Sequence, residues 1–428
     1  MKGATTIVWV ILSLLLLGSF VLDLENVTQG GGIDLRNRIT GIRIMADHLD
    51  AYHYKWQEPD PPEYCDPFNN PSPLVPVSKT TATPALLLLH GPLALLPYRL
   101  AEFLWFPLQW MLLLGTAALW IRRFPKTCQR LLFAALVTGF TYTAAWRLHA
   151  ERGQSYVILL FLFAWWLGAT LEPKTGNRFL TGLLAGLLVT LRPPFLLLAP
   201  FLLLHRRGQL FGATVGLLLG IGLPLLVNPE SWPDYTSAMQ INSELYRNGI
   251  DPRPPPQHYP PTIEGVPTDI LASYVTIPYA DFSVHAFLRW IGLAPFPDLP
   301  PILLAGTLFM GWLWLTRNQQ IEKLLLGVAA WFFLIDLFLP AYRNNYNDVL
   351  ILNVAALGLI ASTTFPLAGW ACVLALPLGW IVYVAAPTQP WLINLSSFFF
   401  TLGAILFLLE PMSTFAMSSR TRLALSKP

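Results

Sequence analysis

The sequence predicts an all-α polytopic integral membrane protein, folded as one bundle of about 12 transmembrane helices. Hydrophobic residues make up 54% of the 428 residues and charged residues only 12%, whereas soluble domains carry about 25% charged residues. Apolar runs of roughly 16–20 residues recur along the chain, and each is close to the length that crosses a bilayer. We therefore assign the whole chain, 1–428, to a single transmembrane domain.

Lysines and arginines in the short loops orient the predicted spans, because cytoplasmic loops carry an excess of these residues. Basic residues cluster at 122–130, directly after one apolar run. We interpret the first apolar run as an uncleaved helix that leaves the cytoplasm, because no small-residue cleavage site follows it. The predicted spans are 5–24, 101–121, 131–148, 155–171, the hairpin arms 179–191 and 195–204, then 210–227, 301–316, 323–340, 349–364, 367–385 and 393–410. This order places both termini in the cytoplasm, and we expect the protein in the plasma (inner) membrane.

The hairpin arms flank the tripeptide Arg192-Pro193-Pro194. Basic residues precede the first arm and follow the second arm. At 1.5 Å per residue each arm reaches only about 20 Å, short of a hydrocarbon core of about 30 Å. We expect a hairpin entered and left from the cytoplasm, which leaves Arg192 recessed below the external surface. An ionisable residue at that depth is typical of a functional site, and the alternative is an arginine that snorkels from a helix end.

Two long polar segments, 25–100 and 228–299, are predicted on the external face. The first contains an amphipathic pattern within 30–56, which predicts a helix lying on the membrane surface or docked over the bundle. Its apolar positions are Leu35, Ile39, Ile42, Met45 and Leu49. The apolar piece 83–97 is broken by Gly91-Pro92 and is interpreted as re-entrant or interfacial. The second segment is rich in proline and is expected to be irregular. Because the predicted cytoplasmic loops are short and the long polar segments lie outside, chemistry is expected on the external face.

Asp34 follows three glycines at the start of the amphipathic pattern, at the predicted boundary between water and lipid. One interpretation is a general base that takes a proton from an acceptor hydroxyl. The other is an N-cap, because an Asp after glycines and before a helical pattern is typical of a helix start. The two roles exclude each other only in part.

Three arginines, Arg36, Arg38 and Arg43, occupy the polar side of the same helix. Guanidinium groups of this kind can bind a phosphate. The alternative is a solvated face that meets anionic lipid, or a pair of i,i+4 ion pairs, Asp34 with Arg38 and Arg43 with Asp47.

Further polar candidates lie in short external loops. Gln154 ends the polar turn 151–154, which joins two spans, and Tyr342, Arg343 and Tyr346 lie in one loop. That loop suits a sugar or a phosphate, although an aromatic interface belt explains the tyrosines equally well. His90, before Gly91-Pro92, is expected to be a packed histidine.

Several common catalytic motifs are missing from the sequence. It has no P-loop, no HExxH, no GxSxG and no Asp-x-Asp triplet. An enzyme that acts outside has no nucleotide sugar to use, so a lipid-phosphate sugar donor fits both facts. The three cysteines fall in different predicted compartments and indicate neither a disulfide nor a metal cluster. No metal, no other cofactor and no nucleic-acid partner are expected.

The order of these features resembles glycosyltransferase family 87. The likeness starts with the first span, the external Asp and the stretch 50–56, Asp-Ala-Tyr-His-Tyr-Lys-Trp. It continues in order with TPALLLLHGPLALLP at 83–97, Gly153-Gln154, the hairpin 182–207, NPESWPDY at 228–235 and the polar loop 340–352. The resemblance covers most of 5–360. It differs in having Arg192 where lysine is common, and in its longer, proline-rich external loops.

The family, also known as DUF2029, comprises polyprenyl-phosphate-mannose-dependent transferases of the GT-C fold class. The resemblance implies an inverting, metal-independent transfer of a hexose, expected to be mannose, with Asp34 as base and a glycan or glycolipid as acceptor. Arg192, with Arg36 or Arg343, is expected to neutralise the leaving phosphate. The residues predicted to bind substrate are Arg36, Arg38, Gln154, Arg192, Tyr342, Arg343 and Tyr346. Two alternatives stay open: a transporter or flippase of a lipid-linked or small polar substrate, and a polymerase or ligase of surface polysaccharide.

Overall fold

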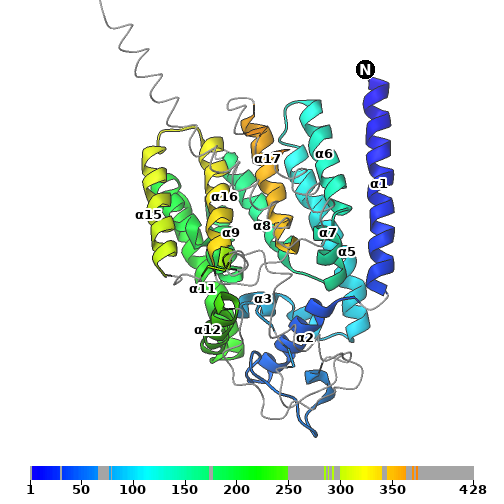
Figure 1. The fold of residues 1–428 in the computed structure, drawn as a ribbon, viewed down its shortest axis with the longest axis vertical. Coiled ribbons are helices and arrows are strands. Elements are labelled where there is room, and N and C mark those ends of the chain that lie inside the picture. Colours follow the sequence, from blue (N-terminus) through cyan, green and yellow to red (C-terminus); the bar gives the residue numbers. More distant parts are fainter. Residues whose placement is uncertain are drawn as a thin grey trace, which may run out of the picture.

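In the computed structural model, the regular secondary structure of the described residues is helical, with a bundle of helices above a layer of shorter ones (Figure 1). The described residues are 2–28, 31–65, 77–78, 80–172, 177–248, 284–285, 288, 292–293, 299–339, 345–362, 369–370 and 373–374. Nearly all of the two predicted spans 367–385 and 393–410 therefore lie outside the described residues.

The bundle is formed by helices that match most of the predicted apolar runs. They are α1 (Lys2–Thr28), α5 (Tyr98–Ile121), α6 (Thr127–Thr141), α7 (Ala144–Arg152), α8 (Tyr156–Leu171), α9 (Arg178–Leu191), η2 (Pro193–Leu197), α10 (Leu198–His205), η3 (Arg207–Gln209), α11 (Leu210–Val227), α15 (Leu299–Leu315), α16 (Ile321–Phe338), η4 (Asn345–Leu350) and α17 (Ile351–Ala361). Among the described residues, 3 helices are long and apolar enough to cross a membrane, or 4 if one bent pair counts as a span. The membrane-helical class agrees with the prediction, and the number of about 12 spans is not confirmed.

The predicted span 131–148 is two helices rather than one. Helices α6 and α7 meet at a bend of 61°. The Thr143 hydroxyl accepts a hydrogen bond from the backbone N–H of Trp146 at 3.4 Å, so it caps α7 as a new helix. A threonine that bonds to the backbone competes with helix continuation, which a pattern of apolar residues does not record.

The predicted hairpin is present and turns at the prolines. Helix α9 ends at Leu191, the 3-10 turn η2 contains both prolines, and α10 returns. Arg178 and Arg206, at the two outer ends, line the same cavity, so the hairpin enters and leaves at one end of the bundle. Proline has no N–H to donate, which ends the helical ladder here.

Helices α9 and α11 cross with glycines rather than side chains between them. A Cβ atom on Gly182 would collide with the carbonyl oxygen of Gln209, and one on Gly186 would collide with that of Ala213. Gly212 and Gly216 of α11 meet α9 carbonyls in the same way. Small residues at spacings of four let two membrane helices bring their backbones together. We call this line of contact, formed by Gly182, Gly186, Gly212 and Gly216, the glycine seam. It fixes the position of α9, whose end carries Arg192.

Gly186→Val should lower the free energy of unfolding by about 1–3 kcal/mol, because the added atoms meet backbone that cannot rotate away. The measurement is the thermal unfolding midpoint of the purified protein in detergent. Gly222→Val in α11 is the matched control, because a Cβ there has nothing within 4 Å. Equal midpoints for the two variants would contradict the glycine seam.

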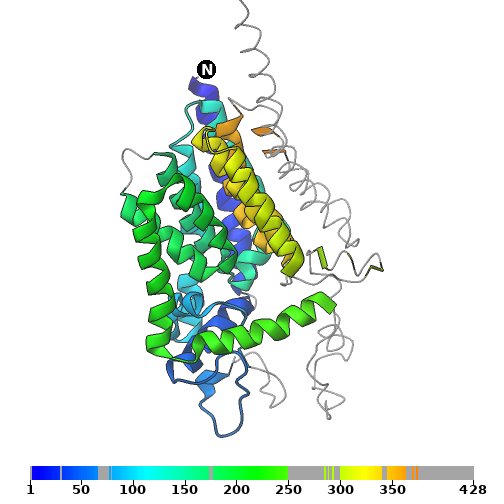
Figure 2. The same cartoon turned by 90° about the vertical axis from the view of Figure 1, so that its left-hand side faces the viewer.

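A layer of short helices covers one end of the bundle. It contains α2 (Ile33–Ala46), η1 (Pro62–Tyr64), α3 (Pro84–Leu89), α4 (Gly91–Ala94) and α12 (Ser231–Asn248). Figure 2 shows α12 lying across this end of the bundle below α15 and α16. The Thr83 hydroxyl donates to the Leu191 carbonyl at 3.3 Å, which ties the layer to the end of α9.

Helix α2 is docked on the bundle, one of the two predicted placements. Its apolar face is buried as predicted for Leu35, Ile39, Ile42 and Met45, which expose at most 3% of their surface. The fifth predicted position, Leu49, lies beyond the end of the helix and is only partly buried. The helix ends at Ala46, well before Trp56, because His48 adopts the left-handed conformation with φ 59° and the backbone N–H of Leu49 donates back to the Ile44 carbonyl at 3.1 Å.

The other predicted elements of this layer are partly corrected. Segment 83–97 forms two short helices and does not span, as expected. The segment 228–299 was expected to be irregular, but it opens with the 18-residue helix α12. Trp232, Tyr235 and Met239 recur there at spacings of three and four, a helical signal that the nearby prolines obscure.

Candidate active site

Two glycines set the start of α2 against the end of α7. The backbone N–H of Gly32 donates to the Glu151 carbonyl at 2.5 Å, and Gly32 has φ 80. A Cβ on Gly31 would lie 2.6 Å from the same carbonyl oxygen, and one on Gly32 would collide with the Tyr98 hydroxyl. A side chain at Gly31 would require a shift of the backbone, and one at Gly32 would displace Tyr98 and strain a backbone that has positive φ.

Asp34 points into the turn that follows α7. Its Oδ2 accepts hydrogen bonds from Arg152 Nε at 2.5 Å and from Gln154 Nε2 at 2.7 Å. The side chain is 17% exposed. In the part of the chain that the structure describes, no group donates to Oδ1. One carboxylate oxygen is therefore held by two donors, while the other is open.

The N-cap interpretation of Asp34 is wrong. Gly32 is the N-cap residue of α2, and no side chain caps that end. Asp34 lies in the first helical turn, where a negative charge is favourable near the helix N-terminus. The alternative ion pair with Arg38 is also wrong, because the carboxylate turns to Arg152 of another helix.

The turn 152–156 is shaped by Gly153 and held by Arg38. Gly153 has φ 67, and a Cβ there would lie 2.7 Å from Cβ of Leu35 in α2. Arg38 donates to Gln154 Oε1 at 2.7 Å and to the Gly153 carbonyl at 3.3 Å. Gln154 is buried and bridges Arg38 to Asp34, so the amide of Gln154 fixes the orientation of the carboxylate.

The other two arginines of α2 hold backbone carbonyls. Arg36 is buried and donates to the Gly31 carbonyl at 2.7 Å. Arg43 donates to the carbonyls of Ala94 at 3.0 Å and Leu96 at 2.8 Å, and burial lowers its pKa. The solvated-face interpretation therefore does not hold for these two, and the ion pair of Arg43 with Asp47 does not form.

Arg192 lies in the interior beside a carboxylate. Its Nη2 is 2.6 Å from Oδ1 of Asp336 in α16, and its guanidinium lies 4.8 Å from the ring centroid of Tyr156. The two charged side chains are 15% and 7% exposed. The snorkelling interpretation is wrong, because the guanidinium points to a partner inside the bundle.

Asp336 was missed by the sequence analysis, although a signal existed. It is the lone ionisable residue in the apolar run from 324 to 339, and such residues in membrane helices usually pair with one another. Nothing in the sequence identifies Arg192 as its partner, because 144 residues separate them.

The turn 152–156 brings the two charged clusters to the same end of the bundle. Arg152 and Gln154 contact Asp34, and Tyr156, two residues later, contacts Arg192. The element η4, which follows the predicted polar loop, packs against α7 and α8. Tyr342 and Arg343 lie outside the described residues, and of Tyr346 only the backbone, within η4, is described.

A family model described as Glycosyltransferase family 87 matches residues 81–340, more than half of the chain. The chain belongs to glycosyltransferase family 87. No curated protein and no solved structure matches it. The matched part of this membrane glycosyltransferase includes Arg152, Gln154, Arg192 and Asp336, and it begins after Asp34.

In this glycosyltransferase, His90 is hydrogen-bonded to Ser155 of the turn 152–156. Its Nδ1 is 2.8 Å from the Leu86 carbonyl, so this nitrogen donates, and the Ser155 hydroxyl donates to Nε2 at 3.0 Å. The ring is fully buried and lies 5.1 Å from the ring of Trp105. The expected packed histidine is confirmed.

Burial, with the positive charge of Arg38, lowers the pKa of His90 to about 3. An unfolded histidine binds a proton below about pH 6.5. The unfolded state therefore binds more protons than the folded state between pH 6.5 and 3, and stability falls as the pH falls through this range. Between pH 6.5 and 5 we expect a loss of about 2 kcal/mol from this residue.

The measurement is the thermal unfolding midpoint at pH 7.5 and pH 5 for the wild-type protein and His90→Gln. Glutamine keeps an acceptor for Ser155 and does not titrate, so its variant should lose less stability on acidification. An equal loss in both proteins would mean that His90 does not cause the acid sensitivity.

Proposed function

We propose that this membrane glycosyltransferase moves a hexose, with mannose as the expected sugar, from a polyprenyl-phosphate donor to an acceptor hydroxyl. The observation that carries the proposal is the geometry of Asp34, whose Oδ2 is held by Arg152 and Gln154 while Oδ1 is open. A fixed carboxylate with one open oxygen suits a general base, because proton transfer requires both a vacant acceptor and a set direction.

The proposed reaction is a single displacement with inversion. Asp34 takes the proton of the acceptor hydroxyl, and the acceptor oxygen forms a bond to the anomeric carbon. The bond between that carbon and the phosphate oxygen breaks, and its electron pair leaves with the polyprenyl phosphate. The two products are the glycosylated acceptor and a lipid monophosphate, which carries one more negative charge than the donor's phosphodiester.

The developing charge on the leaving phosphate requires cationic donors. Arg192 is our candidate because its Nε is buried and takes no partner within the described residues. Asp336 already neutralises part of the Arg192 charge, so a bound phosphate would share this arginine through Nε. Arginine and a single phosphate form strong charge-assisted hydrogen bonds, and we propose that no metal or other cofactor takes part.

The acceptor in this proposal is a glycan or glycolipid at the external, periplasmic side of a plasma (inner) membrane. The layer formed by α2, α3, α4 and α12 carries Asp34 and covers one end of the bundle (Figure 1). The opposite end carries the arginine-rich turns 122–130 and 206–207, which the positive-inside tendency assigns to the cytoplasm. This orientation supports an external site for Asp34.

The test is transfer of label from radiolabelled polyprenyl-phosphate-mannose to a membrane extract by the purified wild-type protein. Transfer of label to an acceptor would support the proposed donor and sugar. Release of labelled free mannose without transfer would support the donor and argue against the acceptor class. Movement of the intact donor across reconstituted vesicles, with no transfer, would instead support a flippase.

A further inference from the structure

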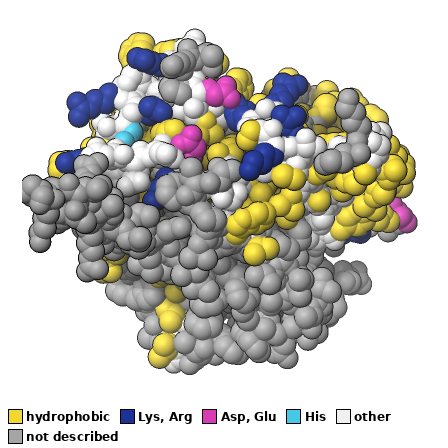
Figure 3. Space-filling view, turned by 90° about the horizontal axis from the view of Figure 1, so that it is seen from above, with side chains coloured by type: hydrophobic (Ala, Val, Ile, Leu, Met, Phe, Trp, Pro, Cys, Tyr) yellow, Lys and Arg dark blue, Asp and Glu magenta, His cyan; other side chains and the backbone are white. Residues whose placement is uncertain are grey.

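A cavity of about 210 Å³ lies at the opposite end of α9 from Arg192. It is formed where α9 begins and where α10 turns through η3 into α11. Its lining residues are Ala169, Arg178, Thr181, His205, Arg206, Arg207, Gly208 and Gln209. Figure 3 views the bundle from the end where α1 begins and shows Lys and Arg side chains gathered around this face.

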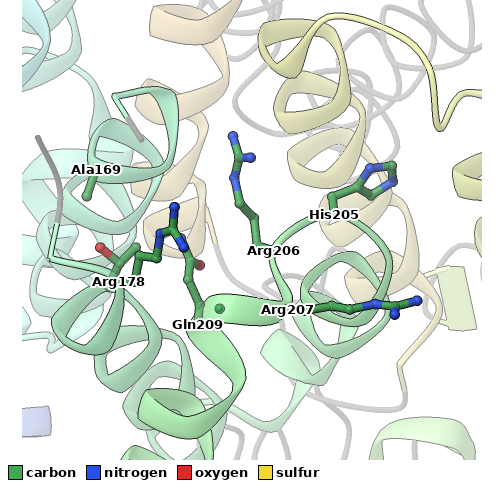
Figure 4. Close-up of a pocket in the computed structure, with 8 residues that line it drawn as sticks. Ala169, Arg178, His205, Arg206, Arg207 and Gln209 are labelled. Atoms are coloured by element: carbon green, nitrogen blue, oxygen red, sulfur yellow. The ribbon is translucent and has the colours of Figure 1, made fainter. Parts of the chain in front are cut away.

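Arg178 and Arg206 extend toward one space, with Gln209 between their helices (Figure 4). Gly208 lets Arg178 cross the turn, because a Cβ there would lie 3.1 Å from Arg178 Cδ. Arg206 donates to the Thr170 carbonyl at 3.2 Å. Arg207 points away from Arg178, and its Nε donates to the Leu203 carbonyl at 3.0 Å (Figure 4).

The described residues that line the cavity carry positive charge and include no carboxylate. Among the described residues, neither Arg178 nor Arg206 forms an ion pair, and the nearby Glu172 pairs with Arg123 at 3.2 Å. Burial and the charge of Arg178 lower the pKa of Arg206. Two arginines that face one space repel each other unless an anion lies between them.

Buried polar atoms in the cavity also have no partner within the described residues. They are Nε of Arg206, Nε2 of His205 and Oε1 of Gln209, and the Gln209 side chain is 5% exposed. A buried polar atom without a hydrogen bond is costly. A bound group with several oxygens and a hydroxyl or water would satisfy both the donors and the acceptor.

Apolar side chains beside the cavity are exposed. Phe179 of α9 and Phe211 of α11 expose 42% and 74% of their surface, and their ring centroids lie 5.8 Å apart. Leu203 of α10 is 52% exposed. Because these helices belong to a membrane bundle, such residues face lipid tails.

We propose that Arg178, Arg206 and Gln209 form a binding site for the phosphate of an anionic membrane phospholipid, with the lipid tails along Phe179 and Phe211. This site is separate from the proposed sugar-transfer site, because the 14 residues of α9 place Arg178 about 20 Å from Arg192. The chemistry that the pocket recognises is a phosphate, and the apolar rim favours a lipid over a free ion.

The test measures binding by native mass spectrometry of the full chain in detergent. The probes are phosphatidylglycerol, phosphatidylcholine and inorganic phosphate. The wild-type protein should bind phosphatidylglycerol more tightly than phosphatidylcholine. Arg178→Gln with Arg206→Gln should weaken phosphatidylglycerol binding roughly thirtyfold, and each single variant roughly fivefold, at about the energy expected per basic residue.

Arg122→Gln is the matched control, because this exposed arginine lies at the same end of the bundle and does not line the cavity. It should keep wild-type affinity. Equal affinity of the wild-type protein for the two lipids, or unchanged binding in the double variant, would overturn the proposal. Saturable binding of inorganic phosphate together with equal affinity for the two lipids would also overturn the lipid assignment, and it would leave a site for free phosphate from the aqueous side. If the double variant does not fold, the single variants and the wild-type lipid preference decide the question.

Discussion

Asp34→Asn should lower the rate of sugar transfer by about 10²–10⁴-fold, the usual contribution of a general base. Asparagine can still accept hydrogen bonds from Arg152 and Gln154 through its oxygen, so the first turn of α2 should keep its contacts. The variant should therefore express normally and retain its thermal unfolding midpoint. The measurement is initial transfer rate with saturating donor, which separates lost chemistry from lost binding.

The matched control is Asp50→Asn in the same layer of short helices. Asp50 Oδ1 accepts from the backbone N–H groups of Tyr52 and His53, and Oδ2 lies 2.8 Å from Nδ1 of His53. An asparagine oxygen can keep the two backbone hydrogen bonds. Its turnover should be that of the wild-type protein. Wild-type turnover in Asp34→Asn would remove Asp34 from the role of base.

Asp336→Leu should lower the free energy of unfolding by about 3–5 kcal/mol, because it leaves Arg192 charged and unpaired inside the bundle. The pair is close, at 2.6 Å, and both side chains are largely buried. The measurement is the thermal unfolding midpoint in detergent, with the recovered fraction of folded protein after purification.

The double variant Arg192→Met with Asp336→Leu separates stability from chemistry. Replacing a buried ion pair by apolar residues of similar volume is often neutral or stabilising, so the double variant should recover most of the lost stability. It should nevertheless transfer sugar poorly, because the proposed phosphate partner is gone. A stable double variant with full activity would show that Arg192 serves the fold alone.

The sequence predicted those parts of the fold that depend on local patterns. The period of apolar residues in α2 located its buried face, and the double proline located the hairpin turn. Helix ends were less predictable where one residue adopts an unusual backbone conformation. Helix α2 stops before His48, a non-glycine residue with φ 59°, and the apolar pattern does not record that conformation.

The candidate site was predictable as single residues and not as a constellation. Asp34 and Gln154 were both singled out, yet 120 residues separate them, and no local pattern records their hydrogen bond. Arg152 was noted only as part of a polar turn, although it makes the shorter contact with Asp34. The Arg36 guanidinium donates to the Gly31 carbonyl, a contact that no local pattern records, and its predicted role toward a phosphate stays a prediction.

The glycine seam between α9 and α11 has a consequence for the path of a long isoprenoid chain. Backbone atoms of the two helices meet directly along this line, which leaves no groove wide enough for a hydrocarbon tail. The outer face of α11, with Phe211, Leu218 and Leu226 exposed, is apolar. The proposed lipid-linked donor would therefore have to enter the interior between other helices, because α9 and α11 are in backbone contact.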